Sequence, residues 1–276
     1  MPADTTTGRV VSVDIPATYS HFRHRTELVY LPPVWFRTGG TVRLPVLEMI
    51  GGEYATPANW IRAGGAVTTA DAFAGKHDGY APILVFVDAS GGFRVDSECV
   101  NGEWGNAEDH LTRDVPRFLQ EQFNAATAPG GWGVVGWSMG GTCAIDLVVR
   151  HPDVFAHFED ISGDLGPNLG GREKTIRALY HGDSAAWAEH DPLTVLDRRR
   201  DYRGVSGWFA DGTGEPFHLN QAARLKAAAD RAGIRTHLQI SPGEHNWMFG
   251  ATAFAEALPW LADQLDPTTL PATGTQ

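Results

Sequence analysis

Cationic residues, cysteines and long apolar runs are all scarce in this 276-residue sequence. Lysine and arginine number 22 against 33 aspartates and glutamates, which gives a formal net charge of -11 at pH 7. This acidic balance disfavours binding to nucleic acid or to anionic membrane surfaces. No apolar run approaches the roughly 20 residues of a membrane-spanning helix. We therefore expect neither a nucleic-acid partner nor a membrane span.

Only two cysteines are present, Cys99 in a loop rich in glycine, aspartate and serine, and Cys143 in a predicted helix. They are either two unrelated small residues or a disulfide that ties the loop to the helix, and two cysteines alone do not decide between these alternatives. A disulfide would indicate an oxidising compartment. Residues 1–8 have neither a basic region nor an apolar core, so we expect no signal peptide within the sequence as given.

Apolar runs of strand length alternate with helix-like runs along the chain. Strands are predicted over residues 9–15, 27–33, 44–50, 81–88, 132–137, 155–163, 205–210 and 235–240, and helices over 59–73, 114–126, 142–150, 220–232 and 251–264. This alternation is typical of a mostly parallel sheet with right-handed crossover connections. The sequence therefore predicts an α/β fold.

The length favours one large domain, which we place over residues 9–265. Residues 164–204 are glycine-rich at first and then charged, and we interpret them as an excursion over the functional site. The ends, residues 1–8 and 266–276, are predicted to be flexible. The long loop over 89–109 follows a buried strand, a position that favours a functional loop.

The most informative motif is Gly136-Trp137-Ser138-Met139-Gly140-Gly141, between a predicted strand and a predicted helix. A G-x-S-x-G sequence at such a corner is the nucleophile elbow of the α/β-hydrolases. The glycines leave room for a tight turn that exposes Ser138, and the following helix directs its positive end at the reacting centre. An overlapping G-x-G-x-x-G sequence over residues 131–136 precedes or forms the strand, so we reject a dinucleotide site.

A serine nucleophile needs a histidine base that is oriented by a carboxylate. In this fold the acid and then the histidine follow the serine, each after a later strand. His245 lies in the loop after the last predicted strand and is the leading candidate, with His237 and His218 as rivals. For the acid, Asp211 and Glu215 both follow the strand over 205–210, and position alone slightly favours Asp211, which could equally cap a turn.

Several motifs together resemble the esterase D family of α/β-hydrolases. They are Leu31-Pro32-Pro33, Met49-Ile50-Gly51-Gly52 ahead of Trp60, the elbow motif, and Gly243-Glu244-His245-Asn246-Trp247. The family includes S-formylglutathione hydrolases, feruloyl esterases and mycobacterial mycolyltransferases, and the resemblance covers residues 9–265. In the family the acid stands in a pattern like G-T-x-D, which Gly212-Thr213-Gly214-Glu215 matches with a glutamate. The resemblance therefore implies Glu215 rather than Asp211 as the acid.

An oxyanion hole needs two backbone N–H groups that point at the developing negative charge. One is expected from Met139, the residue after the nucleophile, and the other from the loop after the third strand. The resemblance implies Gly52 as the second donor. The sequence departs from the family's common H-G-G pattern here, because Ile50 replaces the histidine.

The leading hypothesis is a carboxylesterase that works through an acyl-enzyme and acts on a small-molecule or a lipid or sugar ester. The alternatives are an acyltransferase of the mycolyltransferase type and a non-catalytic binding module on the same fold. None of these requires a cofactor or a metal. Four tryptophans near the predicted site either line an apolar cleft or pack in the core: Trp104, Trp137, Trp208 and Trp247. The resemblance and the disulfide alternative together suggest a secreted or cell-envelope protein.

Overall fold

The fold is described from a computed structural model that covers residues 5–266. The predicted flexible ends, 1–8 and 266–276, fall largely in residues 1–4 and 267–276, which lie outside the described residues. At the N-terminal boundary, the Gly8 N–H donates a hydrogen bond of 2.7 Å to Asp71 Oδ1. At the C-terminal boundary, the Asp266 N–H donates to the Gly130 carbonyl at 2.8 Å.

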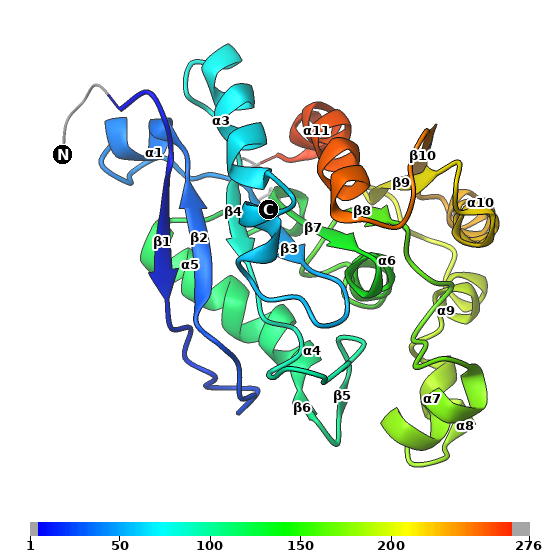
Figure 1. Ribbon diagram of the computed structural model, residues 1–276. Coiled ribbons are helices and arrows are strands. Elements are labelled where there is room, and N and C mark those ends of the chain that lie inside the picture. The colour runs from blue at the N-terminus through cyan, green and yellow to red at the C-terminus, as the bar shows by residue number, and fades with distance from the viewer. Residues whose placement is uncertain (1–4, 267–276) are drawn as a thin grey trace, which may run out of the picture.

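Within the described residues, eight strands form one sheet in the order β1-β2-β4-β3-β7-β8-β9-β10 (Figure 1). Their bounds are β1 Arg9–Val13, β2 Glu27–Leu31, β3 Val46–Ile50, β4 Ile83–Phe86, β7 Trp132–Trp137, β8 His157–Ile161, β9 Ser206–Gly212 and β10 Arg235–Ser241. Strand β2 runs antiparallel to both of its neighbours, and the pairs from β4 to β10 are parallel. The prediction of a mostly parallel α/β sheet is therefore confirmed.

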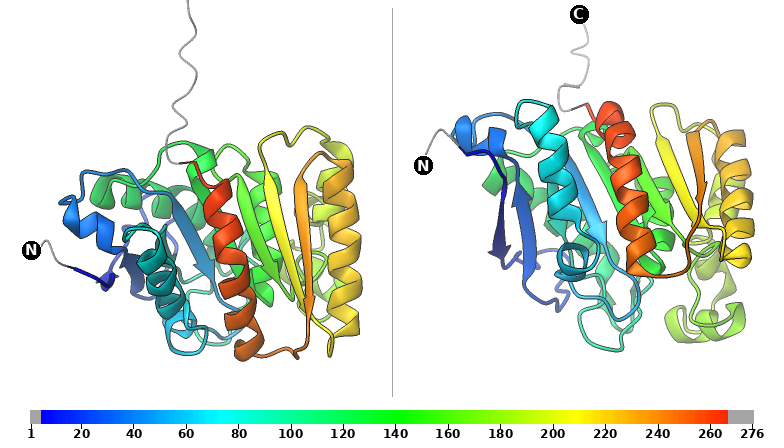
Figure 2. Two further views of the ribbon diagram at one scale, coloured as in Figure 1. Left: turned by 90° about the horizontal axis from the view of Figure 1, so that it is seen from above. Right: turned by 45° about the horizontal axis from the view of Figure 1, so that its top comes forward.

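Helices cover both faces of this sheet. They are α1 Pro33–Arg37, α2 Asn59–Arg62, α3 Ala66–Lys76, α4 Ala107–Asp109, α5 Val115–Phe123, α6 Met139–Arg150, α7 Arg172–Leu179, α8 Ser184–Ala188, α9 Pro192–Arg198, α10 Pro216–Arg231 and α11 Trp247–Gln264. Helices α3 and α11 pack side by side on one face (Figure 2). Helices α5, α6 and α10 contribute to the core on the other face.

The central strands are buried because both of their faces pack against helices. All residues of β3, β4 and β8 are buried. Alternate side chains of these strands enter the two apolar clusters on opposite faces: in β4, Ile83 and Val85 join one cluster, and Leu84 and Phe86 join the other. This explains why β4 is a continuous apolar run in the sequence.

Several local elements differ from the sequence-based expectation. The helix predicted over 59–73 is two helices, α2 and α3, because Gly65 between them has a φ of +59°, a left-handed conformation that ends the helical path. The strand predicted over 27–33 ends at Leu31, and the prolines begin helix α1 instead. A π-helical turn over His110–Asp114 precedes α5, so helical structure begins before the predicted residue 114. The long loop also holds a hairpin of β5 (Asn101–Gly102) and β6 (Gly105–Asn106).

Residues 164–204 contain the three helices α7, α8 and α9, and α7 and α8 lie at the lower right in Figure 1. In this segment Leu179 and Tyr180 form a small apolar cluster with Val100 of the long loop. That the segment is an excursion from a single domain over 9–265 stays a prediction. Among the described helices, none combines the length and the apolar character that crossing a membrane requires.

Candidate active site

Ser138 stands alone at the sharp corner between β7 and α6. Its backbone has a φ of +59° and a ψ of -123°, a strained conformation for a residue that carries a Cβ. The turn closes only because glycines flank it: a Cβ added to Gly136 would lie 1.7 Å from the Gly140 carbonyl oxygen, and one added to Gly140 would lie 2.3 Å from the Ile50 carbonyl oxygen. The predicted elbow is therefore present, with the serine at its tip.

A continuous hydrogen-bonded relay links Ser138, His245 and Glu215. His245 Nε2 lies 2.8 Å from Ser138 Oγ, and His245 Nδ1 lies 2.8 Å from Glu215 Oε1. Ser138 follows β7, Glu215 begins α10 after β9, and His245 lies between β10 and α11. Strands β7, β8, β9 and β10 are parallel and adjacent in this order, so the carboxyl ends of this half of the sheet bring together residues 107 positions apart in the sequence.

Asp211, the alternative acid, lies elsewhere. Strand β9 continues to Gly212, so Asp211 belongs to the strand, where it is fully buried. Neither of its carboxylate oxygens has a hydrogen-bond partner within the described residues, so it does not cap a turn. Burial, together with the negative charges of Asp160 and Glu215, raises the pKa of Asp211 to about 8. Of the two acids, the structure therefore brings only Glu215 to His245.

Two further residues, Ser162 and His218, contact Glu215 at the acid end of the relay. Ser162, just after β8, donates from Oγ to Glu215 Oε2 at 2.9 Å, so both oxygens of the carboxylate are engaged. His218 places Nδ1 3.5 Å from Glu215 Oε1, and its ring stacks on His245 with the ring centroids 4.8 Å apart. Sequence reasoning missed Ser162 and treated His218 only as a rival base. The carboxyl-end position of Ser162, beside the strand that precedes the acid, is the signal that could have found it.

The environment of His245 favours the neutral imidazole. Burial lowers the pKa of His245, the positive charge of His218 acts in the same direction, and the carboxylate of Glu215 opposes both. The other rival, His237, lies within β10 and stacks on Trp208 with ring centroids 3.9 Å apart. His237 is therefore part of the packing around β9 and β10 and does not join the relay.

The two residues predicted to form the oxyanion hole lie beside Ser138. Met139 is the first residue of α6. Gly52 passes so close to the nucleophile that an added Cβ would lie 3.1 Å from Ser138 Cβ and 2.8 Å from the Trp137 ring. The Gly52 carbonyl accepts a hydrogen bond from the Ala55 N–H at 3.0 Å, which closes the loop over residues 51–55. We call this segment the oxyanion loop.

The four tryptophans separate into different environments. Trp137 packs with its ring centroid 5.0 Å from that of His245 and 4.5 Å from that of Trp247, so these two support the histidine. Trp208 is buried in the core and donates from Nε1 to Gln239 Oε1, so core packing is the alternative that holds for it. Trp104 lies in the turn between β5 and β6 and is 40% exposed.

Several large apolar side chains stand exposed close in sequence to the site residues. Tyr54 follows Gly52 in the oxyanion loop, Phe217 follows Glu215, and Met248 follows His245, with exposed fractions of 51%, 66% and 76%. Phe93, in the long loop after β4, is 73% exposed, and its ring centroid lies 6.1 Å from that of Tyr54. We call these four residues the apolar rim. Of the four, Tyr54 and Phe93 form a contiguous exposed apolar pair, and contiguous exposed apolar groups are typical of a binding surface.

A disulfide joins Cys99 to Cys143, with a Cα–Cα distance of 5.8 Å. Of the two alternatives left open by the sequence, pairing is the one observed. Both cysteines are fully buried. The bond fixes the long loop to the second turn of α6, the helix that begins directly after Ser138.

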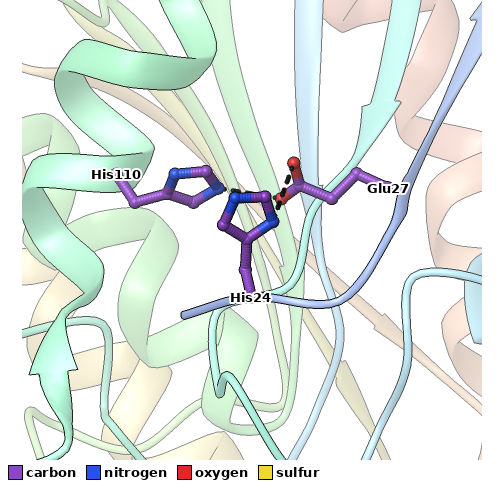
Figure 3. Close-up of side chains that lie close together, drawn as sticks. All are labelled: His24, Glu27 and His110. Atoms are coloured by element: carbon purple, nitrogen blue, oxygen red, sulfur yellow. Dashed lines mark hydrogen bonds and ion pairs between the residues drawn. The ribbon is translucent and has the colours of Figure 1, made fainter. Parts of the chain in front are cut away.

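Within residues 5–266, two groups bring histidine and carboxylate ligand atoms within 4.8 Å of one another: His24, Glu27 and His110, and Glu215, His218 and His245. In the first group the rings of His24 and His110 stack with centroids 4.3 Å apart (Figure 3). An ion shared between stacked rings would lie out of the ring planes, away from the nitrogen lone pairs. In the second group both His245 nitrogens already face Ser138 and Glu215. Both arrangements favour hydrogen bonding over metal coordination.

The strand order, the elbow and the relay define the class of the protein: it has the α/β-hydrolase fold, with the serine, acid and histidine arranged as in serine hydrolases. The family described as "Putative esterase" matches residues 21–261, and the chain belongs to this family.

Two curated relatives and one solved structure show how far the similarity extends. The chain is 30% identical over 268 residues to an uncharacterized protein of Corynebacterium glutamicum, covering 94% of this chain and 63% of the relative. It is 30% identical over 134 residues to the diacylglycerol acyltransferase/mycolyltransferase Ag85A of Mycobacterium ulcerans, covering 44% of this chain and 38% of the relative. The chain thus spans less than two thirds of either relative. An S-formylglutathione hydrolase from Agrobacterium tumefaciens superposes with a TM-score of 0.76 at 19% identity, covering 95% and 97% of the two chains.

Proposed function

We propose that this protein is a carboxylesterase that cleaves its substrate through an acyl-enzyme on Ser138. The observation that carries the proposal is the relay in which His245 contacts Ser138 Oγ and Glu215, each at 2.8 Å. A serine hydroxyl is a poor nucleophile without such a base. Membership of the esterase family supports the same reaction class. The complete relay argues against a non-catalytic binding module.

In the proposed mechanism, His245 Nε2 accepts the Ser138 proton as Oγ attacks the ester carbonyl. Glu215 accepts a hydrogen bond from Nδ1–H and stabilises the imidazolium that forms. The N–H groups of Met139 and Gly52 stabilise the oxyanion of the tetrahedral intermediate. The imidazolium then protonates the departing alcohol, which leaves an acyl group on Ser138. Water, activated by His245 in the same way, releases the acid and regenerates the serine.

The apolar rim supports a substrate with an apolar group. Tyr54, Phe217 and Met248 lie within three positions of Gly52, Glu215 and His245 in the sequence, and Phe93 packs on Tyr54. From there they would contact the part of the ester beyond the scissile bond. We therefore infer a small-molecule or a lipid or sugar ester as substrate. The net charge of -11 disfavours a polyanionic one.

An acyltransferase is the second candidate, and one observation favours it: the similarity to a mycolyltransferase over 44% of this chain. In that reaction a second alcohol takes the place of water in deacylation, and every proposed catalytic residue keeps its role. His245 remains 33% exposed, so an acceptor could reach the acyl-enzyme from solvent.

A panel of nitrophenyl esters of increasing chain length, with and without trehalose or glycerol, tests both candidates. A carboxylesterase releases acid and nitrophenol in equal amounts whether or not the alcohol is present. An acyltransferase forms a new ester and releases nitrophenol faster when the acceptor is added. Ser138→Ala is the control and should abolish turnover and labelling by a fluorophosphonate probe. Labelling that persists in this variant would contradict the assignment of the nucleophile.

The disulfide also bears on where the protein acts. Disulfides persist in oxidising environments and are rare in the cytosol. We propose that the protein works outside the cytoplasm, as a secreted or cell-envelope enzyme, because Cys99 and Cys143 are joined.

A further inference from the structure

An ion pair between the buried Asp88 carboxylate and the Arg25 side chain, which is 29% exposed, lies beside the oxyanion loop. Asp88, just after β4, is 1% exposed, and its carboxylate binds the Arg25 guanidinium through two hydrogen bonds, Nε to Oδ2 at 2.8 Å and Nη2 to Oδ1 at 2.6 Å. The Arg25 backbone N–H also donates to Oδ2, at 2.7 Å. The same carboxylate accepts from the N–H groups of Ser90 and Gly91, so the position of Asp88 is fixed from several sides.

Arg25 uses the same nitrogen to hold the oxyanion loop. Its Nη2 donates to the Ala55 carbonyl oxygen at 2.9 Å, and the Ala55 N–H in turn donates to the Gly52 carbonyl at 3.0 Å. A small cavity of about 10 Å³ is lined by Asp88 and Ala55 together with both proposed oxyanion donors, Gly52 and Met139. The Asp88 carboxylate is therefore next to the backbone that would stabilise the oxyanion, and Arg25 contacts the same loop through Ala55.

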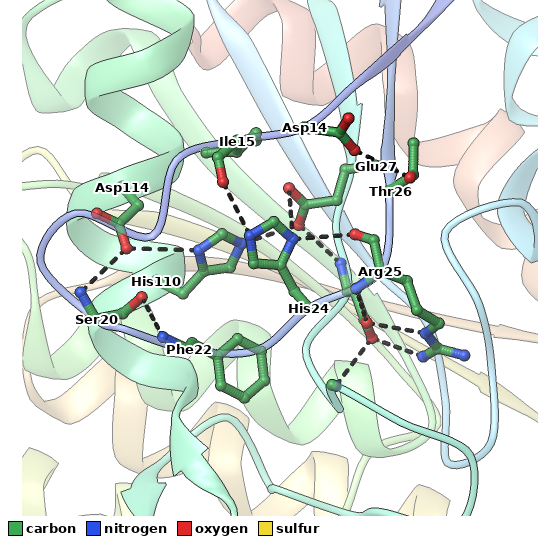
Figure 4. Close-up of polar contacts among 12 residues, drawn as sticks. Asp14, Ile15, Ser20, Phe22, His24, Arg25, Thr26, Glu27, His110 and Asp114 are labelled. Atoms are coloured by element: carbon green, nitrogen blue, oxygen red, sulfur yellow. Dashed lines mark hydrogen bonds and ion pairs between the residues drawn. The ribbon is translucent and has the colours of Figure 1, made fainter.

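Glu27, His110 and His24 form a second layer of contacts around Asp88 and Arg25. Glu27 Oε1 accepts a hydrogen bond from the Asp88 N–H at 3.0 Å and lies 3.0 Å from His110 Nε2. The ring of His24 stacks on His110 and places its two nitrogens 2.9 and 3.0 Å from the carbonyl oxygens of Ile15 and Arg25 (Figure 4). These contacts tie Arg25 and Asp88 to the first strands of the sheet, which makes the pair a rigid support.

We propose that Arg25, held by Asp88, is a positioning residue that fixes the oxyanion loop through the Ala55 carbonyl. The inference rests on the proposed function and adds a residue to it that neither the nucleophile motif nor the relay contains. The guanidinium is suited to this task because its planar fork supplies donors to a carboxylate and a carbonyl at once. The oxyanion loop contains two adjacent glycines, so its backbone depends on such an external contact for a single conformation.

The test is Arg25→Lys in the full chain. A lysine keeps the charge beside Asp88 but has no rigid fork with which to reach the Ala55 carbonyl at the same time. Loss of one oxyanion donor typically lowers kcat by about 10²–10³-fold, and a misplaced donor should cost about 10–100-fold. We therefore expect kcat on a nitrophenyl ester to fall by about 10–100-fold, with KM changed by less than about threefold, because the oxyanion forms only in the transition state.

A second measurement separates positioning from general structural support. A trifluoromethyl ketone adds to the serine and places an oxyanion in the same site, so its affinity for Arg25→Lys should weaken in parallel with kcat/KM. The matched control is Arg43→Lys, since Arg43 makes an exposed hydrogen bond to Thr127 Oγ1, and its kinetics should stay within about twofold of wild type. Should Arg25→Lys fail to fold, Asp88→Asn, which keeps the side-chain shape, is expected to show the same selective loss of kcat.

The outcomes distinguish the inference from the proposed function. Wild-type kcat in a folded Arg25→Lys variant, or a rise in KM at constant kcat, overturns the role of Arg25 and leaves the esterase proposal intact. Equal losses in Arg25→Lys and Arg43→Lys overturn it too. If the wild-type protein neither hydrolyses the esters nor reacts with the fluorophosphonate probe, the proposed function fails and the inference fails with it.

Discussion

Replacing Glu215 by glutamine tests the relay at its most specific contact. In the wild-type protein one carboxylate oxygen faces His245 Nδ1 at 2.8 Å and the other accepts from Ser162 Oγ at 2.9 Å. Glutamine offers one acceptor and one donor in place of two acceptors. If its NH₂ group faces His245, the imidazole is held in the wrong tautomer, an error that costs about 10⁴-fold in kcat in a serine protease triad.

The contact with Ser162 sets the lower limit of the effect. The hydroxyl of Ser162 can rotate and accept from the glutamine NH₂, and the amide oxygen then still faces His245. In that orientation the tautomer is kept and only the negative charge opposite the imidazolium is lost. We expect this orientation to cost about 10²-fold, so the decrease in kcat lies between about 10² and 10⁴, or about 3–5 kcal/mol.

Asp211→Asn is the matched control, since Asp211 is a buried carboxyl four positions away with no hydrogen-bond partner in the described chain. We expect its kcat to stay within a few-fold of wild type. Its stability should become less dependent on pH. An acid whose pKa is raised to about 8 in the folded state stabilises the protein below pH 4, and this contribution falls as the pH rises to 8, on the order of 5 kcal/mol in all.

Steady-state kinetics and thermal melts at pH 6 and pH 9 measure both effects. Glu215→Gln should lose activity with little change in melting temperature, and Asp211→Asn should keep activity and melt above the wild type at pH 9. An Asp211→Asn variant that loses 100-fold in kcat, beside a Glu215→Gln variant that loses less than tenfold, would refute the assignment of the acid.

Three further results are expected. The profile of log(kcat/KM) should rise with pH as His245 loses its proton, with a midpoint below the ordinary histidine pKa of about 6.5, and a flat profile from pH 5 to 8 would contradict the role of His245 as base. His218→Gln should move that midpoint to higher pH, because the positive charge of His218 lowers the pKa of His245; an unchanged midpoint would show that the stacked ring has no electrostatic effect. Replacing Cys99 and Cys143 by serine should lower the free energy of unfolding by about 4 kcal/mol, because the bond closes a loop between residues 44 positions apart, and thermal melts measure the change. Two free thiols in never-reduced protein from an oxidising host would rule the disulfide out.

Sequence reasoning found the parts of the site that depend on local chain geometry. The strand over 132–137 and the elbow at Ser138 are predictable because glycines, strand formers and a helix occur in fixed order. His245 is predictable for the same reason, since it follows the last strand. The choice between Glu215 and Asp211 needed the family resemblance, because the sequence does not show where β9 ends.

Most of the supporting contacts could not be predicted from the sequence. His218 is an exception, because it lies three positions after Glu215 on α10, and its contact was missed because this helix was predicted to begin at residue 220. Ser162 reaches Glu215 only through the packing of neighbouring strands and belongs to no motif. The same holds for Arg25, which is 63 positions from Asp88 and 30 from Ala55. Such contacts depend on tertiary structure, and no periodicity along the chain records them. Local differences, such as the interruption at Gly65, arise because a glycine's backbone angle is not specified by the apolar pattern.

The separation of 107 residues between Ser138 and His245 has a consequence for biosynthesis. His245 follows β10, the edge strand of the sheet, so an emerging polypeptide has no base for its serine until this last strand has docked. Catalysis therefore reports completion of the C-terminal part of the fold. Truncation before β10, or local unfolding of β10 in mild denaturant, should abolish activity while the central strands remain folded. Activity should therefore detect unfolding at this edge of the sheet before the helical circular dichroism signal changes.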